Sequence, residues 1–320
     1  MKKILCLLVM MTIIATMFVA CNSTDTEPNA EPIEKAYNLA IGVAVTPSTA
    51  NAKITETVAA VVTDADGKLV LCRFECIEYA VKVGDDGELV KTAPVGKAAQ
   101  GDAYDAYSPM AAGTWYKQAD ALAKSFEGKT QAEIADTANT NGYLDDAELK
   151  ASCSINVNDM LVAVDNAFKS EFKTEFKSTA DTFSAGVVAL GTVEDKSTET
   201  EGNVKFTVDF AASVLENGKV VASILDSTEV TLKNVTAEEG VFSAAEAEFK
   251  GTKRTQGTAY DAYSPMAAGT WYVQADAYAA AANGKTVDDI ATLATEGVAG
   301  CTIYAGGYKQ AIENAVKAAK

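Results

Sequence analysis

Histidine is absent from the chain of 320 residues, and tryptophan occurs only twice. The lack of histidine excludes Ser-His-Asp and Cys-His catalysis and every histidine-ligated zinc, iron or copper site. Positive charge is also scarce, because 27 lysines and arginines face 44 aspartates and glutamates, which gives a net charge of -17. We therefore expect neither nucleic acid nor an anionic lipid surface as a partner of this acidic protein.

The remaining polar residues give little support to catalysis or metal binding. Asp105 and Asp261 are available as bases, but no nucleophile pair stands near them in the sequence. The acidic turns at Asp64–Gly67 and Asp85–Gly87 lack the longer ligand series, ending in glutamate, that a calcium loop requires. We expect a protein that is not an enzyme and has no metal site.

The first residues have the pattern of a secretory signal. Lys2 and Lys3 precede an apolar run that ends at Ala20, directly before Cys21. The run is shorter than the roughly 20 residues of a membrane-spanning helix, and a small residue followed by cysteine is what a lipid-attaching signal peptidase requires. We expect residues 1–20 to be a signal peptide and Cys21 to carry the lipid. Cleavage after Ala20 without lipid, or an uncleaved anchor, is the alternative.

Residues 21–35 predict the anchored end of the mature protein. After Cys21 the segment is rich in Asn, Ser, Thr, Glu and Pro and has almost nothing to bury, which is typical of a flexible tether. Several acyl chains such as palmitate on one cysteine would give stable anchoring, because a single chain binds only marginally. The predicted location is the extracytoplasmic side of the cell membrane.

An internal repeat organises the rest of the chain. Residues 103–116, AYDAYSPMAAGTWY, recur unchanged at 259–272, and shorter matches continue on both sides. The repeat predicts one domain over 36–170 and a second over 182–320, joined by a linker at 171–181.

Each repeat predicts a small antiparallel sheet followed by about three helices, so the fold class is α+β. Apolar, β-branched runs flank Asp66-Gly67 and Asn217-Gly218, which are hairpin signals. Trp115, Ala119, Leu122 and Phe126 follow at helical spacing, and Thr130-x-x-Glu133 is a capping box for a second helix. We expect a short strand near 155–157, repeated near Ile303, and then a last helix in each repeat.

Four cysteines remain in the mature chain besides Cys21. Cys72 and Cys76 are about 13 Å apart in a strand, whereas a disulfide allows only about 4.4 to 6.8 Å between Cα atoms. We expect these two cysteines, Cys153 and Cys301 to be buried free thiols, with a pair between Cys72 and Cys153 as the alternative.

The repeat resembles the FMN-binding domain family, as found in Gram-positive surface lipoproteins. The resemblance covers both repeats and rests on a hairpin with Asp-Gly-Lys at its turn, a Tyr-containing segment leading into Trp-Tyr-x-Gln, then Gly-Lys-Thr and a small-residue segment before the last helix. In that family FMN is attached to the threonine of a Ser-Gly-Ala-Thr motif. Here Ala151–Ser154 and Ala299–Thr302 occupy those places. The resemblance therefore implies Ser154 and Thr302 as acceptor positions, although the leading Ser is missing and Cys replaces Ala.

The repeated segment is the best candidate site. A flavin needs aromatic walls and a phosphate contact, which Tyr116, Tyr272, Lys129 and Lys285 could help to provide. The candidate residues for binding are Tyr104, Asp105, Tyr107, Trp115, Tyr260, Asp261, Tyr263 and Trp271. The structural interpretation is that the aromatic residues are core and that Gly-Lys-Thr ends one helix and begins the next.

Two classes of function follow. The first is a binding or electron-transfer module that holds a small aromatic ligand, with FMN as the possible cofactor. The second is a cofactor-free structural lipoprotein whose repeated segment is core or contacts a surface protein partner.

Overall fold

The computed structural model describes residues 33–320, apart from residues 86, 93, 107–111, 181 and 262–265. The chain divides into two units, Met1–Ile33 and Glu34–Lys320, and the second contains both repeats. The predicted signal peptide and Cys21 lie outside the described residues. No helix in the described part of the chain is long and apolar enough to span a membrane.

The first repeat begins with three long antiparallel strands. Strand β1 (Lys35–Ser48) pairs along its length with β2 (Lys53–Asp64), which pairs in turn with β3 (Leu69–Ala80). The turn between β2 and β3 is confirmed, and Gly67 has a φ of +76°, which glycine adopts without a steric penalty. After the helices, β4 (Thr174–Ser178) pairs with β1, so the sheet order is β3-β2-β1-β4.

The second repeat begins with the same three-strand meander but adds its fourth strand at the opposite edge. Strands β5 (Ser184–Asp195), β6 (Val204–Glu216) and β7 (Lys219–Lys233) form a second meander. The turn at Asn217-Gly218 is confirmed, with positive φ at both residues. Strand β10 (Glu246–Phe249) completes the order β10-β7-β6-β5, and β8 (Thr236–Glu238) forms a separate hairpin with β9 (Val241–Ser243).

The helices follow the strands in each repeat, so the α+β class is confirmed. In the first repeat they are α1 (Lys97–Gln100), the 3-10 helix η1 (Gly101–Ala106), α2 (Trp115–Ser125), α3 (Gln131–Ala135), α4 (Ala147–Ser152) and α5 (Asn158–Lys169). In the second they are α6 (Lys253–Gln256), α7 (Thr258–Asp261), α8 (Trp271–Ala280), α9 (Val287–Ala291) and α10 (Gly306–Ala318). The predicted helices correspond to α2, α3 and α5 and to α8, α9 and α10, and the others are short.

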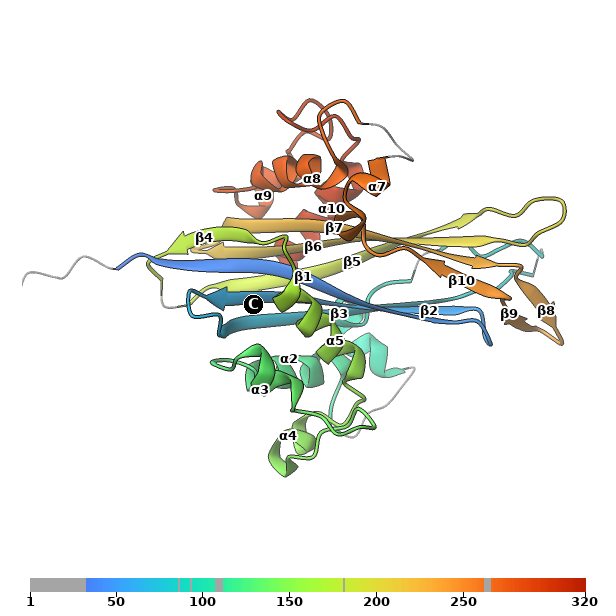
Figure 1. Ribbon diagram of the computed structural model, residues 1–320, viewed down its shortest axis with the longest axis horizontal. Coiled ribbons are helices and arrows are strands. Elements are labelled where there is room, and N and C mark those ends of the chain that lie inside the picture. The colour runs from blue at the N-terminus through green and yellow to red at the C-terminus, as the bar shows by residue number, and fades with distance from the viewer. Residues whose placement is uncertain (1–32, 86, 93, 107–111, 181, 262–265) are drawn as a thin grey trace, which may run out of the picture. The chain divides into compact units, whose positions relative to one another are not determined.

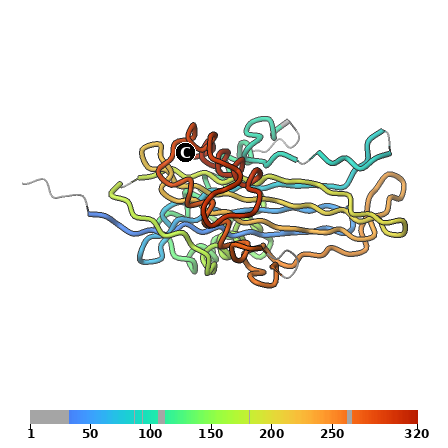
Figure 2. The backbone as a smooth tube through the Cα atoms, turned by 90° about the horizontal axis from the view of Figure 1, so that it is seen from above, coloured from blue at the N-terminus to red at the C-terminus, as the bar shows by residue number. Residues whose placement is uncertain are grey.

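The unit Glu34–Lys320 has four layers. The two sheets lie back to back, with α2 to α5 on the outer face of one and α8 to α10 on the outer face of the other (Figure 1). From above, the strands run along the length of the unit and α10 crosses over them (Figure 2). The space between the two sheets is filled by apolar side chains of both, including Ile77, Tyr79, Phe206 and Phe210. Each outer boundary has its own core between sheet and helices.

The shared inner core differs from the predicted picture of two domains on a linker. Residues 171–181 include β4, which belongs to the first sheet and also lies against β7 of the second repeat. The physical reason is that β2 is buried almost continuously from Thr57 to Thr63, and a strand buried on both faces needs a second layer. Each sheet therefore covers the inner face of the other.

The predicted short strand near 155–157 is wrong, and so is its counterpart at Ile303. Both segments are loops that lead into the last helix of the repeat. Their backbone groups bond elsewhere, because the N–H of Val157 donates to the carbonyl of Gly142, and the N–H of Ile303 donates to a glutamine side chain. The apolar side chain of Val157 is buried between sheet and helices all the same.

Candidate functional site

In each repeat, one lysine lies over two aromatic rings of the described part of the repeated segment. Lys97 Nζ lies 5.4 Å from the ring centroid of Tyr104 and 6.0 Å from that of Trp115. In the second repeat, Lys253 Nζ lies 5.2 Å from Tyr260 and 5.5 Å from Trp271. These distances are those of cation–π contacts, so the ring faces that could have stacked on a flavin already have a partner.

Acidic groups complete this lysine site. Lys97 Nζ is 2.7 Å from Glu78 Oε1, and Lys253 Nζ is 3.6 Å from Glu229 Oε1. Burial alone would lower the pKa of Lys253, but the pKa is raised above its usual value because Tyr308, Tyr260 and carboxylates surround the amine. The lysine is therefore a fixed cation that holds the aromatic residues in place.

The hydroxyls at the proposed acceptor positions are held by a buried glutamine. Gln274 is fully buried, and its Oε1 accepts from the backbone N–H of Thr302 at 2.8 Å and from Thr302 Oγ1 at 2.9 Å. In the first repeat, Gln118 Oε1 accepts from the N–H of Ser154 at 2.8 Å and from Ser154 Oγ at 3.2 Å. The Gln of Trp-Tyr-x-Gln is thus a clamp on the loop that precedes the last helix.

The predicted binding residues do not converge on one cavity. Trp115 and Trp271 are 6% and 2% exposed and belong to the outer cores. Asp261 Oδ1 accepts from the N–H of Trp271 at 3.3 Å, which fixes the start of α8, and Asp105 is half-buried in the first repeat. Tyr107 and Tyr263 lie outside the described residues. These contacts do not test the FMN hypothesis, which stays a prediction.

The Gly-Lys-Thr motif joins helices, as its structural interpretation predicted. Gly128 has a φ of +76°, and Thr130 forms the predicted capping box with Glu133 at the start of α3. The carbonyl of Lys129 accepts from the N–H of Leu69, so this turn is also tied to β3. The second repeat repeats the arrangement at Gly284 and Thr286.

The four cysteines described are buried free thiols, as predicted. Cys72, Cys76, Cys153 and Cys301 form no disulfide, so the alternative pair of Cys72 with Cys153 is not present. Burial raises the pKa of Cys76 and of Cys153 to about 11, which keeps both thiols protonated and unreactive at neutral pH.

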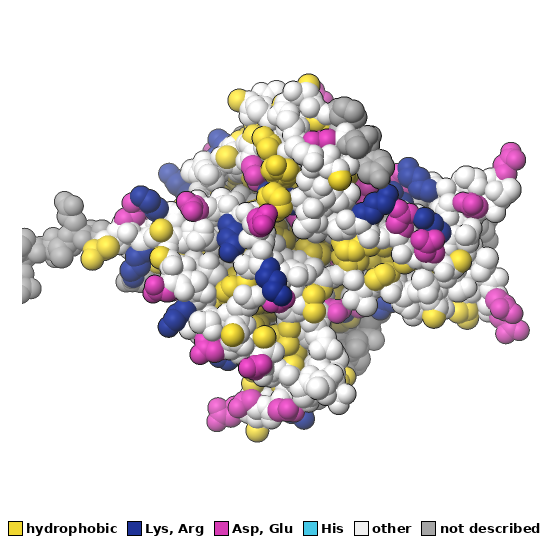
Figure 3. All heavy atoms as spheres, viewed as in Figure 1, with side chains coloured by type: hydrophobic (Ala, Val, Ile, Leu, Met, Phe, Trp, Pro, Cys, Tyr) yellow, Lys and Arg dark blue, Asp and Glu magenta, His cyan; other side chains and the backbone are white. Residues whose placement is uncertain are grey.

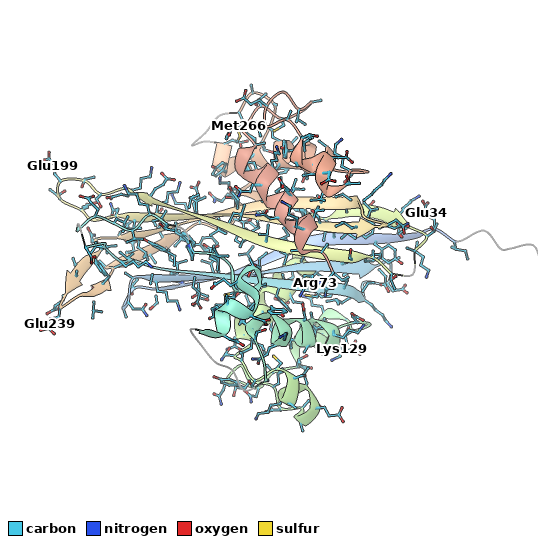
Figure 4. The ribbon with its side chains drawn as sticks, turned by 180° about the vertical axis from the view of Figure 1, so that it is seen from behind. Glu34, Arg73, Lys129, Glu199, Glu239 and Met266 are labelled. Carbon is cyan, nitrogen blue, oxygen red and sulfur yellow. The ribbon has the colours of Figure 1, made fainter. Side chains whose placement is uncertain are left out.

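A cleft between the two repeats is a second candidate site in the described part of the chain. It has a volume of about 880 Å³ and lies between the edge strands β3 and β5, with α1 on one side and α10 on the other. Arg73 stands at its wall, between the helices of the two repeats (Figure 4). The volume is within the range of pockets that hold small molecules, and interfaces between domains are a common place for such pockets.

The walls of the cleft are mostly apolar, with a few polar groups. Arg73 donates to the backbone carbonyls of Ala185, Cys72 and Lys320, so its guanidinium ties β3 to the second repeat. Glu75 accepts backbone N–H bonds from Cys76, Ala98 and Ala99, and burial raises its pKa to about 7. These two charged residues are held by the fold. Four other charged residues also line the cleft, namely Asp120, Asp209, Lys317 and Lys320.

The equivalent position in the other half of the unit is largely filled. There the cleft measures about 360 Å³ and is lined by Arg254, Phe172 and Tyr272 among others. Arg254 occupies the place of Ala98 in the repeat, donates to the carbonyl of Leu225 and to Asp276, and lies 5.7 Å from the ring of Phe172. Hydrophobic side chains gather at the middle of the face shown in Figure 3. The first cleft is open where Ala98 replaces a buried arginine.

Sequence reasoning missed the cleft, although one signal was present. Lys97-Ala98-Ala99-Gln100 aligns with Lys253-Arg254-Thr255-Gln256 directly before the repeated segment. The change from arginine to alanine beside an unchanged lysine marks a place where the two repeats differ in volume. No protein-family model, curated protein or solved structure matches this chain.

Proposed function

We propose that the protein is a lipid-anchored, extracytoplasmic binding protein that holds a ligand in the cleft between its two repeats. The observation that carries this proposal is the asymmetry of the two clefts. Of two equivalent positions, one is filled by Arg254 and Phe172, and the other keeps about 880 Å³ beside Ala98. Dense packing is the rule in protein interiors, and the cleft beside Ala98 has more than twice the volume of its counterpart, which supports binding.

Filling the cleft tests this function. Ala98→Arg introduces the residue that the second repeat carries at the equivalent position. The surroundings are related as well, because Phe74 and Asp120 of the first repeat align with Leu225 and Asp276 of the second. We expect the variant to fold, because an arginine is accommodated in the equivalent surroundings. Binding of the uncharged apolar dye Nile red, followed by its fluorescence, should fall by about tenfold or more.

Val273→Lys is a matched control. It also introduces the residue of the other repeat, since Lys117 aligns with Val273, but Val273 is exposed on α8 and does not line the cleft. The control should bind the dye like the unchanged protein. Equal dye binding by Ala98→Arg and by the unchanged protein would contradict the proposed site.

The lipid anchor needs a separate test. The N-terminal pattern that ends at Ala20-Cys21 supports lipidation. In a bacterial host that modifies lipoproteins, labelled palmitate should enter the protein, and Cys21→Ser should remove the label and release the chain from the membrane fraction. Cys6→Ser, within the signal, is the control that should keep both label and location. Unchanged labelling of Cys21→Ser would overturn the anchor.

A further inference from the structure

The chemistry of the cleft wall indicates which class of ligand it takes. The wall on the side of the second repeat is β5, which is the outermost strand of its sheet. An edge strand presents backbone N–H and C=O groups that no neighbouring strand satisfies. A ligand beside such an edge therefore meets peptide groups as well as apolar side chains.

Ala185 shows which residues of β5 face this edge. Its carbonyl accepts from Arg73 Nε at 3.3 Å and from the N–H of Lys320 at 3.4 Å, and neither donor belongs to β6. In an antiparallel pair, successive residues present their backbone groups to alternate sides. Val187 therefore presents its N–H and C=O on the same side as Ala185, and Val187 lines the cleft.

The open stretch of edge ends at a strand-like contact of the chain itself. Leu190 forms an isolated antiparallel bridge with Val95, and directly afterwards the chain turns away at Gly96 into α1. Between Ala185 and Leu190 the edge extends for about 16 Å at roughly 3.3 Å per residue. The segment at Val95 shows that an extended backbone fits against β5, and it leaves the edge where the cleft begins.

Two side-chain amides face the same space. Gln310 and Asn314 lie one turn apart on α10 and line the cleft, and neither side-chain amide forms a hydrogen bond to another of the described residues. In the first repeat the equivalent of Asn314 is Asn166, whose Nδ2 donates to the carbonyl of Val43 at 2.8 Å. An amide at this helix position thus satisfies a strand backbone in one repeat and is free to satisfy a ligand in the other.

We infer that the cleft binds an extended peptide segment, which pairs with the backbone of Val187 and hydrogen-bonds to the side chains of Gln310 and Asn314. The apolar walls receive the alternate side chains of the peptide, as in other cases of strand addition to a sheet edge. The inference rests on the proposed function of the cleft and specifies its ligand. A compact apolar molecule would use the walls but leave the edge and both amides without partners.

The test compares two blocked peptides of alternating valine and threonine in the full chain, by isothermal titration. One has ordinary amides, and the other is methylated on every backbone nitrogen, which removes all N–H donors and keeps the side chains. We expect the first to bind and the second to bind at least about tenfold more weakly, because two lost hydrogen bonds are of that order. Equal binding of both peptides would overturn the inference.

Variants of the protein test the same hydrogen bonds by removing the groups of the protein that form them. Val187→Pro removes the N–H at the edge, where proline is tolerated because it breaks no bond to β6, and it should abolish peptide binding. If that variant does not fold, the double variant Gln310→Leu/Asn314→Leu on the surface of α10 provides the test. Its affinity for the peptide should be about tenfold lower than that of the unchanged protein. Unchanged peptide binding in the folded variant sinks the inference.

The dye separates this inference from the proposed function. One outcome is that the dye binds to the unchanged protein and not to Ala98→Arg, while neither peptide binds. The cleft is then a site for compact apolar molecules, and only the peptide inference fails. If neither the dye nor a peptide binds, both fail together.

Discussion

Glu56 and Thr228 join the two sheets at the centre of the unit. Thr228 Oγ1, on β7 of the second repeat, donates to Glu56 Oε2, on β2 of the first, at 2.5 Å, and both residues are completely buried. Glu56 Oε1 has no hydrogen-bond partner among the described residues. A carboxyl group in such surroundings is more stable neutral than ionised, so burial favours the protonated form of Glu56 although the Thr228 hydrogen bond favours the ionised one.

The stability of the fold should therefore fall as the pH rises. Burial raises the pKa of Glu56 from 4.5 to about 8, against the opposing effect of the Thr228 hydrogen bond. Between these values the folded chain keeps the proton and the unfolded chain has lost it, so the free energy of unfolding decreases with pH and levels off above about 8. The full effect is on the order of 5 kcal/mol. Urea denaturation at several pH values between about 5 and 9 measures it.

Glu56→Gln isolates this residue from other buried acids, such as Glu75, whose pKa is also raised. Glutamine keeps the side-chain size and an acceptor for Thr228 but does not titrate. The variant should lose the part of the slope that extends up to about pH 8, whereas the contribution of Glu75 between about pH 5 and 7 should remain. A slope equal to that of the unchanged protein would show that Glu56 ionises freely in the fold.

Local chemistry was enough to predict the elements within each repeat. Asp66-Gly67 and Asn217-Gly218 define hairpin turns because glycine or asparagine accepts positive φ there, and Thr130 and Glu133 define a helix start through mutual hydrogen bonds. These signals lie within a few residues of each other. The structure confirms them because no distant contact competes.

Contacts between the repeats could not be predicted in this way. The apolar run around Val58–Val62 is compatible with a strand covered on one face or on both, and only the second sheet decides between them. The predicted strand near 155–157 failed because Gln118, distant in sequence, takes the backbone N–H of Ser154. The cleft depends on which residues of one repeat face Ala98 of the other, and no sequence period reports that.

Glycine under the last helix of each repeat should be irreplaceable. A Cβ at Gly42 would lie 1.9 Å from the carbonyl oxygen of Ala163, and one at Gly186 would lie 2.0 Å from that of Ala315. Gly42→Ala and Gly186→Ala should each lower the free energy of unfolding by about 3 kcal/mol or more, because the helix must move away from the sheet. Thermal unfolding followed by circular dichroism measures the loss.

Gly67→Ala is the control for the conformational part of the glycine effect. Gly67 has open space around its Cα but a φ of +76°, so alanine there should cost only about 1 kcal/mol of backbone strain. If all three variants lost the same free energy, close packing of helix on sheet would not be the reason for Gly42 and Gly186.

The glutamine clamp should matter more than the hydroxyl that it holds. Gln274→Leu leaves the N–H groups of Thr302 and Ile303 and the carbonyl of Gly269 without their partner. We expect a loss of about 2 to 4 kcal/mol, since each buried unpaired group costs about 1 kcal/mol or more. Thr302→Val removes only the hydroxyl and should cost less than about 1 kcal/mol. Equal losses in the two variants, measured by urea denaturation, would contradict a clamp on the backbone.

Trp271 offers the sharpest choice between core and ligand wall. Its indole is 2% exposed, its Nε1 donates to Tyr308 Oη at 3.1 Å, and its ring lies against Lys253. Trp271→Leu should therefore lower the free energy of unfolding by about 3 kcal/mol, whereas Tyr304→Leu, at a residue that is 69% exposed, should leave it nearly unchanged. Both are measured on protein purified from the native membrane, together with its absorption spectrum. Suppose instead that the purified protein is yellow with flavin, and that Trp271→Leu loses this colour but keeps its thermal midpoint. The indole would then be a wall of a flavin site, and the repeated segment would have to be assigned to the cofactor and not to the core.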